Sequence, residues 1–144
     1  MRKSNQVLRS LALTAAAVAG SAVVTASPAQ AATSFDVCGP TNYCSLSYTF
    51  GTITWYNRTA GVTGSVVDVG PGNTTAYFEA FAGSTKIDSQ TRTADDETSL
   101  GSPRGFNFTI GDTNLVGGID RIKITVCFTD STGQQCGTPQ NFSK

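Results

Sequence analysis

The sequence predicts an all-β protein of two antiparallel sheets packed face to face, and three observations support this fold class. Apolar and polar residues alternate with a period of two in several short runs, as in strands that bury one face. Turns rich in glycine or proline, such as GPGN, AGST and GSPRG, separate these runs. After the leader, no stretch combines sustained helical spacing with helix caps. Strands with one polar face must bury the other against a second sheet.

The chain begins with a segment that predicts export. Basic residues near the start are followed by the apolar run LALTAAAVAGSAVVTA and by AQA, which places small residues where a signal peptidase cuts. We expect a secretory signal at 1–31, in preference to a membrane anchor, and a single β-sandwich domain at 32–144. The mature protein is then secreted and extracellular, with no membrane span.

The first clear strands lie in LSYTF and TITWYN, on either side of Gly51. The expected inward positions are Leu46, Tyr48 and Phe50 before that glycine, and Ile53 and Trp55 after it. The inward set therefore moves from even to odd positions, which suggests a bulge or bend at Gly51.

Further strand candidates follow in GVTGSVVDV, TTAYFEAFA, STKIDSQTRT, GFNFTIG and RIKITVCF, which brings the expected number to seven or eight. An immunoglobulin-like sandwich is the first expectation, and a jelly roll or small barrel is the alternative. The shared core is expected to contain Trp55, Phe106, Phe108, Ile122 and Ile124.

Four cysteines in a small exported chain predict two disulfides. Cys127 alternates with the polar residues of RIKITVC and so points to the solvent face, which argues against a bridge through the core. If ST is the centre of a type I turn in DSTG, Cys127 and Cys136 lie opposite one another; a three-residue loop would offset them by one. We therefore expect the local pairs Cys127–Cys136 and Cys38–Cys44, the second closing the loop CGPTNYC.

The residue inventory excludes most catalytic chemistry. The chain has no histidine, which removes Ser-His-Asp and Cys-His nucleophiles and the common catalytic zinc sites. A carboxylate-only glycosidase survives this exclusion, but most of the ten acidic residues lie beside turn residues, where aspartate is favoured for local hydrogen bonding. We expect a protein that is not an enzyme and uses no cofactor.

The net charge and the spacing of possible metal ligands exclude further classes of partner. Seven basic and ten acidic residues remain after residue 31, giving a formal charge of −3 that argues against nucleic acid as a partner. The cysteine spacing does not match zinc knuckles, and we expect no metal site. Asp95, Asp96 and Glu97 leave calcium binding in a loop as an open alternative, although the segment has no EF-hand spacing.

Aromatic residues provide the remaining functional signal. In TTAYFEAFA the alanines share one face with Phe78, while Tyr77, Glu79 and Phe81 share the other, and burying that second face would bury a carboxylate. In TITWYNR the same alternation sends Tyr56 outward. We expect a binding surface of Tyr56, Tyr77, Glu79 and Phe81, since exposed rings beside an acid can stack on a sugar or anchor a protein. The alternative is that other parts of the chain cover these rings.

By its leader, its size, the strand ending in RIKITVC and the short C-x8-C hairpin, the chain resembles small secreted β-proteins of high-GC Gram-positive bacteria. It is also similar in outline to the neocarzinostatin-type apoproteins of enediyne chromoproteins, which are secreted immunoglobulin-like sandwiches with two local disulfides. The cysteine positions depart from that family, because one loop is near the mature N-terminus and the other near the C-terminus.

The leading hypothesis is a non-catalytic binding protein whose partner is an extracellular protein or polysaccharide. A small-ligand carrier like the chromoprotein apoproteins is the alternative, and a secreted protease inhibitor acting through CGPTNYC is a third. A concave apolar pocket would favour the carrier, and a flat aromatic face would favour the binding protein.

Overall fold

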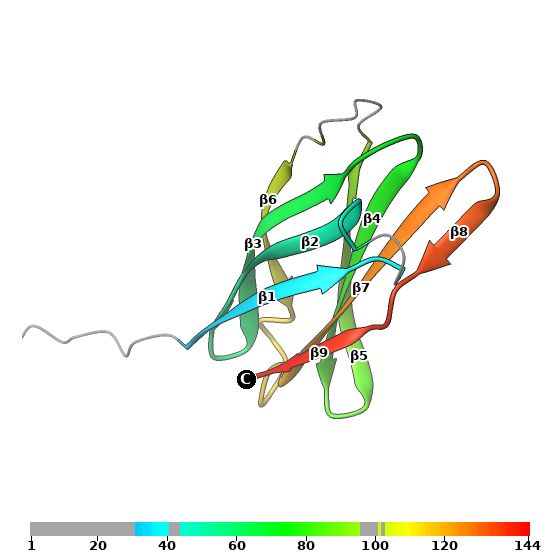
Figure 1. The fold of residues 1–144 in the computed structure, drawn as a ribbon. Coiled ribbons are helices and arrows are strands. Elements are labelled where there is room, and N and C mark those ends of the chain that lie inside the picture. The colour runs from blue at the N-terminus through cyan, green and yellow to red at the C-terminus, as the bar shows by residue number, and fades with distance from the viewer. Residues whose placement is uncertain (1–30, 41–43, 96–100, 102) are drawn as a thin grey trace, which may run out of the picture.

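The computed structural model describes residues 31–40, 44–95, 101 and 103–144. These residues form nine strands and no helix (Figure 1). The strands are β1 (Ala32–Cys38), β2 (Ser47–Trp55), β3 (Thr59–Asp68), β4 (Asn73–Ala82), β5 (Thr85–Ala94), β6 (Arg104–Gly111), β7 (Arg121–Asp130), β8 (Gly133–Cys136) and β9 (Gln140–Ser143). Within the described ranges, a helix of sufficient length and apolarity to cross a membrane is absent. The expected signal sequence lies outside the described residues except for Ala31.

Two antiparallel sheets make up the fold (Figure 1). Sheet A has the order β1-β2-β3-β6, and sheet B has the order β5-β4-β7, with β8 and β9 both pairing along the far edge of β7. The prediction of an all-β sandwich with two local disulfides is confirmed. The immunoglobulin-like arrangement stays a prediction.

The core lies between the sheets and is centred on Phe78 of β4. Its ring packs edge-on against Phe35, Phe106 and Phe108 of sheet A, with centroids 6.1, 5.3 and 5.1 Å away. The expected core is confirmed for Trp55, Phe106, Ile122 and Ile124, which are all buried. Phe108 packs against the core but is only half-buried, and the Arg92 guanidinium lies 4.4 Å from its ring centroid.

The expected faces of β2 are wrong before Gly51. Odd-numbered positions face the core along the whole strand, so Ser47 and Thr49 are buried whereas Phe50 is 40% exposed. There is no bulge, because the register of β2 with both neighbours continues unbroken through Gly51. Leu46, Tyr48 and Phe50 therefore do not belong to the core.

A close approach of two backbones explains this arrangement. Gly51 pairs with Gly64 of β3, and a Cβ atom added to Gly51 would lie 2.1 Å from the Thr63 carbonyl oxygen. Phe35 pairs with Gly51 from β1, and Phe106 pairs with Gly64 from β6. The core volume that inward side chains at 51 and 64 would occupy is filled by these flanking rings.

Both expected disulfides are present, Cys38–Cys44 and Cys127–Cys136. Cys127 and Cys136 are direct partners across β7 and β8, and Asp130 pairs with Gly133 at the turn. The Thr132 amide and hydroxyl both donate to Asp130 Oδ1, at 2.7 and 2.6 Å, which closes the turn and lowers the pKa of that carboxyl.

The predicted outward orientation of Cys127, away from the core, is confirmed, although the residue is not itself exposed. Its side chain is on the outer side of sheet B, as the alternation predicts, yet only 2% of the residue is exposed. The bridge to the exposed Cys136 covers it.

Candidate binding surfaces

Three of the four predicted binding residues lie together on the outer side of sheet B. Tyr77, Glu79 and Phe81 alternate with the buried Ala76, Phe78 and Ala80 along β4. We use the name sheet B face for Tyr77, Glu79 and Phe81 of β4, Lys86 of β5, and Arg121 and Lys123 of β7. The register pairs Glu79 with Lys123 and Phe81 with Arg121, and a shift after Ala80 pairs Phe81 with Lys86 on the other side.

Glu79 is held between two cations on this face. Its carboxylate forms ion pairs with Lys123 Nζ at 2.5 Å and with Lys86 Nζ at 3.2 Å. The hydrogen bond from Lys123, and more weakly the one from Lys86, hold the pKa of Glu79 below its ordinary value despite some desolvation. Glu79 is therefore a charged, paired carboxylate at neutral pH, which is the wrong state for a general acid.

The aromatic rings of the sheet B face already have partners within the chain. The Arg121 guanidinium lies 4.0 Å from the ring centroid of Phe81, and Lys123 Nζ lies 5.5 Å from it. The hydroxyl of Tyr77 accepts a hydrogen bond from Gln134 Nε2 at 3.1 Å. Both rings are half-buried, so β5 and β7 partly cover them.

The pairing of Glu79 predicts a pH-dependent stability. A carboxyl whose pKa is lowered by folding stabilises the fold above its unfolded pKa, about 4.3 for glutamate, and this stabilisation is lost as the pH falls through the folded value. We expect wild type to melt slightly above Glu79→Gln at pH 7, with the gap closing below about pH 4. Thermal melts of both proteins from pH 7 to pH 2.5 measure the gap. A gap that is constant across this range would contradict the assigned pairing.

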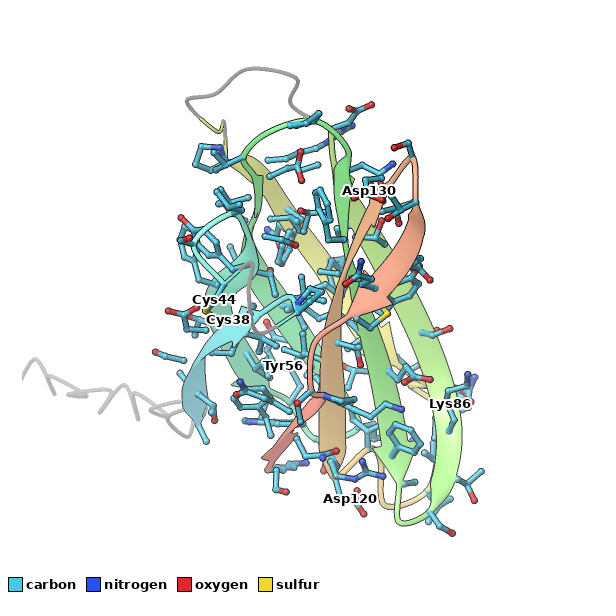
Figure 2. The ribbon with its side chains drawn as sticks, turned by 45° about the vertical axis from the view of Figure 1, so that its right-hand side comes forward. Cys38, Cys44, Tyr56, Lys86, Asp120 and Asp130 are labelled. Atoms are coloured by element: carbon cyan, nitrogen blue, oxygen red, sulfur yellow. A yellow bond between two sulfur atoms is a disulfide. The ribbon has the colours of Figure 1, made fainter. Side chains whose placement is uncertain are left out.

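Tyr56 does not join the sheet B face. It follows β2 in sheet A, it is 36% exposed, and its ring lies against Gly61 of β3. Figure 2 shows Tyr56 and Lys86 on different sheets of the sandwich. The predicted four-residue surface is therefore divided between two sheets.

A second aromatic surface, which the sequence did not predict, lies on the outer side of sheet A. Tyr48 and Phe50 project from β2 with their rings stacked, the centroids 6.1 Å apart and the planes 29° from parallel. Phe50 pairs with Asp36 of β1 and Ser65 of β3, so a carboxylate and a hydroxyl flank the exposed ring. The alternation in SYTFGTITW gives this placement only when the same parity is kept through Gly51, and the pairing with β1 and β3 is what establishes that parity.

Small polar residues surround this aromatic pair. We use the name sheet A face for the outward positions that the register brings together around it. Its aromatic and polar members are Ser34, Asp36, Tyr48, Phe50, Thr52, Thr54, Thr63, Ser65, Asn107 and Thr109, while the direct cross-strand partners of Tyr48 are the apolar Cys38 and Val67. Asp36 is the one charged side chain in this set. The face therefore offers hydroxyl and amide groups around two rings, with almost no charge.

Cavities border both faces. One of about 580 Å³, beside the Cys38–Cys44 bridge, is lined by Asp36, Cys38, Cys44, Ser45 and Tyr48. Another, of about 400 Å³, adjoins the sheet B face and includes Tyr77, Glu79, Thr125 and Gln134 in its lining. The rest of the CGPTNYC loop, 41–43, lies outside the described residues.

The described residues supply no group of three or more Cys, Asp or Glu side chains placed to hold a metal ion. Asp96 and Glu97 of the acidic run lie outside the described residues, and Asp95 is exposed at the end of β5. Neither a protein-family model, nor a curated protein, nor a solved structure matches this chain.

Proposed function

We propose that this is a secreted, non-catalytic protein that binds an uncharged polysaccharide on the sheet A face. The observation that carries the proposal is the stacked pair of Tyr48 and Phe50, with Phe50 40% exposed in the middle of a sheet. A pyranose ring has an apolar C–H side that packs on aromatic rings, and hydroxyls around its edge. The small polar side chains around the pair are suitable partners for those hydroxyls.

The sheet A face supports this function better than the sheet B face for a physical reason. Stacking requires a ring whose flat side is free, and the Phe81 ring has Arg121 over it. Tyr48 and Phe50 stack on each other, which occupies at most one flat side of each ring, and Phe50 is the more exposed of the two, at 40%. An uncharged ligand is favoured because only Asp36 carries charge among the surrounding outward positions.

Secretion is the part of the proposal that the disulfides support. Two bridges among four cysteines are compatible with an oxidising extracellular environment, where such bonds persist. The predicted leader points to the same location. The likeness to small secreted β-proteins of high-GC Gram-positive bacteria remains part of this proposal.

The carrier and inhibitor alternatives have less support. Phe78 packs against Phe35 and Phe106 between the sheets, where a carrier would need an apolar cavity. The cavities at the two faces have polar and exposed residues in their linings. The loop that an inhibitor would use includes residues outside the described ranges.

Replacing Phe50 by serine is expected to weaken binding to an uncharged polysaccharide by at least about tenfold, as loss of a central stacking ring does. Native gels containing soluble glucans, mannans or xylans would measure this from the retardation of the protein. The melting temperature should change little, since an exposed ring contributes little to folding.

Val116→Ser is the matched control, because Val116 is 90% exposed in the segment between β6 and β7 and is not part of the sheet A face. It should be retarded as strongly as wild type. Equal retardation of wild type and Phe50→Ser would refute the sheet A face as the binding site.

A further inference from the structure

We propose that the sheet B face is a second binding surface, which takes the carboxylates of an acidic polysaccharide. This inference does not depend on the function proposed for sheet A, because it uses other residues and another ligand chemistry. It rests on the positive charge of the face, on the neutral groups that hold Arg121 in position, and on the cavity with several hydroxyl groups beside the cations.

Positive charge is concentrated on this face. Lys86, Arg121 and Lys123 are three of the seven basic residues after residue 31, and Glu79 is the one acid among them. The chain after residue 31 carries a formal charge of −3, so the sheet B face has the opposite sign to the protein as a whole. Asp120 precedes Arg121 in the sequence but is not part of the sheet B face, and its carboxylate accepts a hydrogen bond from the Gly83 amide at 2.7 Å. Such a surface attracts anions and orients the protein toward them.

Arg121 is held in place by neutral groups. Its guanidinium donates to Asn141 Oδ1 at 2.6 Å and to the Gly83 carbonyl at 3.4 Å, and its central carbon lies over the Phe81 ring. Within the described part of the chain, Arg121 forms no ion pair with a carboxylate. A guanidinium fixed in this way retains donors that match the two oxygens of a carboxylate, with little ordering required on binding.

Glu79 occupies the position between the two lysines that a ligand carboxylate would take. Its ion pairs are at the surface, and Lys86 is 54% exposed. Surface ion pairs contribute little stability, so an incoming carboxylate can replace Glu79 as the partner of Lys86 at low cost. Glu79 therefore keeps the lysines in position and competes with the ligand.

The cavity beside the cations indicates a sugar rather than a simple anion. Its volume of about 400 Å³ is bordered by Phe78, Glu79, Lys86 and the Cys127–Cys136 bridge, and the neutral polar part of its lining includes Tyr77, Ser89, Thr91, Thr125 and Gln134. These provide four hydroxyls, one amide and part of one aromatic ring. A uronate residue presents a carboxylate and several hydroxyls on one ring, so it can contact the cations and the hydroxyl-lined cavity together.

The experiment compares retention on immobilised polygalacturonate, poly-glutamate and polyphosphate in a salt gradient. Wild type should elute from polygalacturonate at a higher salt concentration than from either other matrix. Arg121→Gln and Lys123→Gln should each weaken this binding roughly five-fold at low salt, the size expected of one exposed ion pair. Glu79→Gln should strengthen it, because a competing carboxylate is removed.

Arg104→Gln is the matched control, since it removes one positive charge at the exposed start of β6 in sheet A. It should elute with wild type. Equal weakening by Arg104→Gln and Arg121→Gln would show that only net charge matters, and weaker binding by Glu79→Gln would show that Glu79 contacts the ligand. Either result overturns the inference. It is also overturned if polygalacturonate does not retain the wild-type protein, or retains it no better than poly-glutamate or polyphosphate does.

Because Phe50→Ser changes only sheet A, it should bind polygalacturonate as wild type does. Failure of the sheet A proposal and failure of this inference are thus distinguishable. The two faces lie on opposite sides of the sandwich, which allows both to be occupied at once (Figure 1).

Discussion

Replacing Phe78 by alanine is expected to lower the free energy of unfolding by about 3–5 kcal/mol, the range for deletion of a buried aromatic side chain. The ring is fully buried and packs against three other phenylalanine rings, so its loss leaves a cavity that neither sheet can fill alone. Since a domain of this size has a total stability of about 5–15 kcal/mol, the melting temperature should fall by roughly 15 °C or more.

Phe81→Ala is the matched control, with the same chemical change three residues further along β4. That ring is on the outer side, where its main partner is the Arg121 guanidinium. A surface cation–π contact contributes about 0.5–1 kcal/mol, so the loss should be several times smaller than for Phe78. Urea unfolding of both variants measures the difference. Similar losses for the two variants would mean that the outer ring is as important to folding as the central one.

The contrast between Phe78 and Phe81 was predictable from sequence because it depends on a local pattern. Within one strand, side chains alternate between the faces, and a carboxylate at Glu79 identifies the outer one. The Cys127–Cys136 bridge was predictable for the same kind of reason, since DSTG defines a turn and the turn sets the register.

The faces of β2 were not predictable in this way. Tyr48 and Phe50 are more apolar than Ser47 and Thr49, so hydrophobicity places the aromatic pair in the core, and reversing this requires knowledge of distant strands. Thr49 can face inward because its hydroxyl donates to the Ser65 carbonyl at 2.9 Å, and Ser47 because its hydroxyl accepts from Thr74 at 2.9 Å. These partners are 16 and 27 residues away.

The candidate binding residues also divide into those that a local pattern predicts and those that only long-range strand pairing places. Tyr77, Glu79 and Phe81 are on one strand, so their shared face could be predicted from alternation. Alternation also predicts an outward Tyr56, but it does not assign Tyr56 to a sheet, because the sheet to which a strand belongs is set by long-range pairing. The cations of the sheet B face come from β5 and β7, and only the register reveals that they surround Glu79.

Replacing Gly51 by alanine is expected to destabilise the protein by about 3 kcal/mol or more, at the upper end of the cost of overpacking a core. The new methyl carbon would lie 2.1 Å from the Thr63 carbonyl oxygen and 2.7 Å from Gly64 Cα, so β2 and β3 would have to separate. Because these contacts are with backbone, no change of side-chain rotamer relieves them.

Gly105→Ala is the control that separates this close approach from a general effect of glycine in a strand. Gly105 is in β6 of the same sheet, and the nearest atom to its added methyl would be 3.9 Å away. Alanine there should be neutral or stabilising by up to about 1 kcal/mol, because glycine loses more conformational freedom on folding. If Gly51→Ala were as stable as Gly105→Ala in urea unfolding, β2 and β3 could not be as close as the register requires. The outward placement of Tyr48 and Phe50, and the sheet A face with it, would then lose its structural basis.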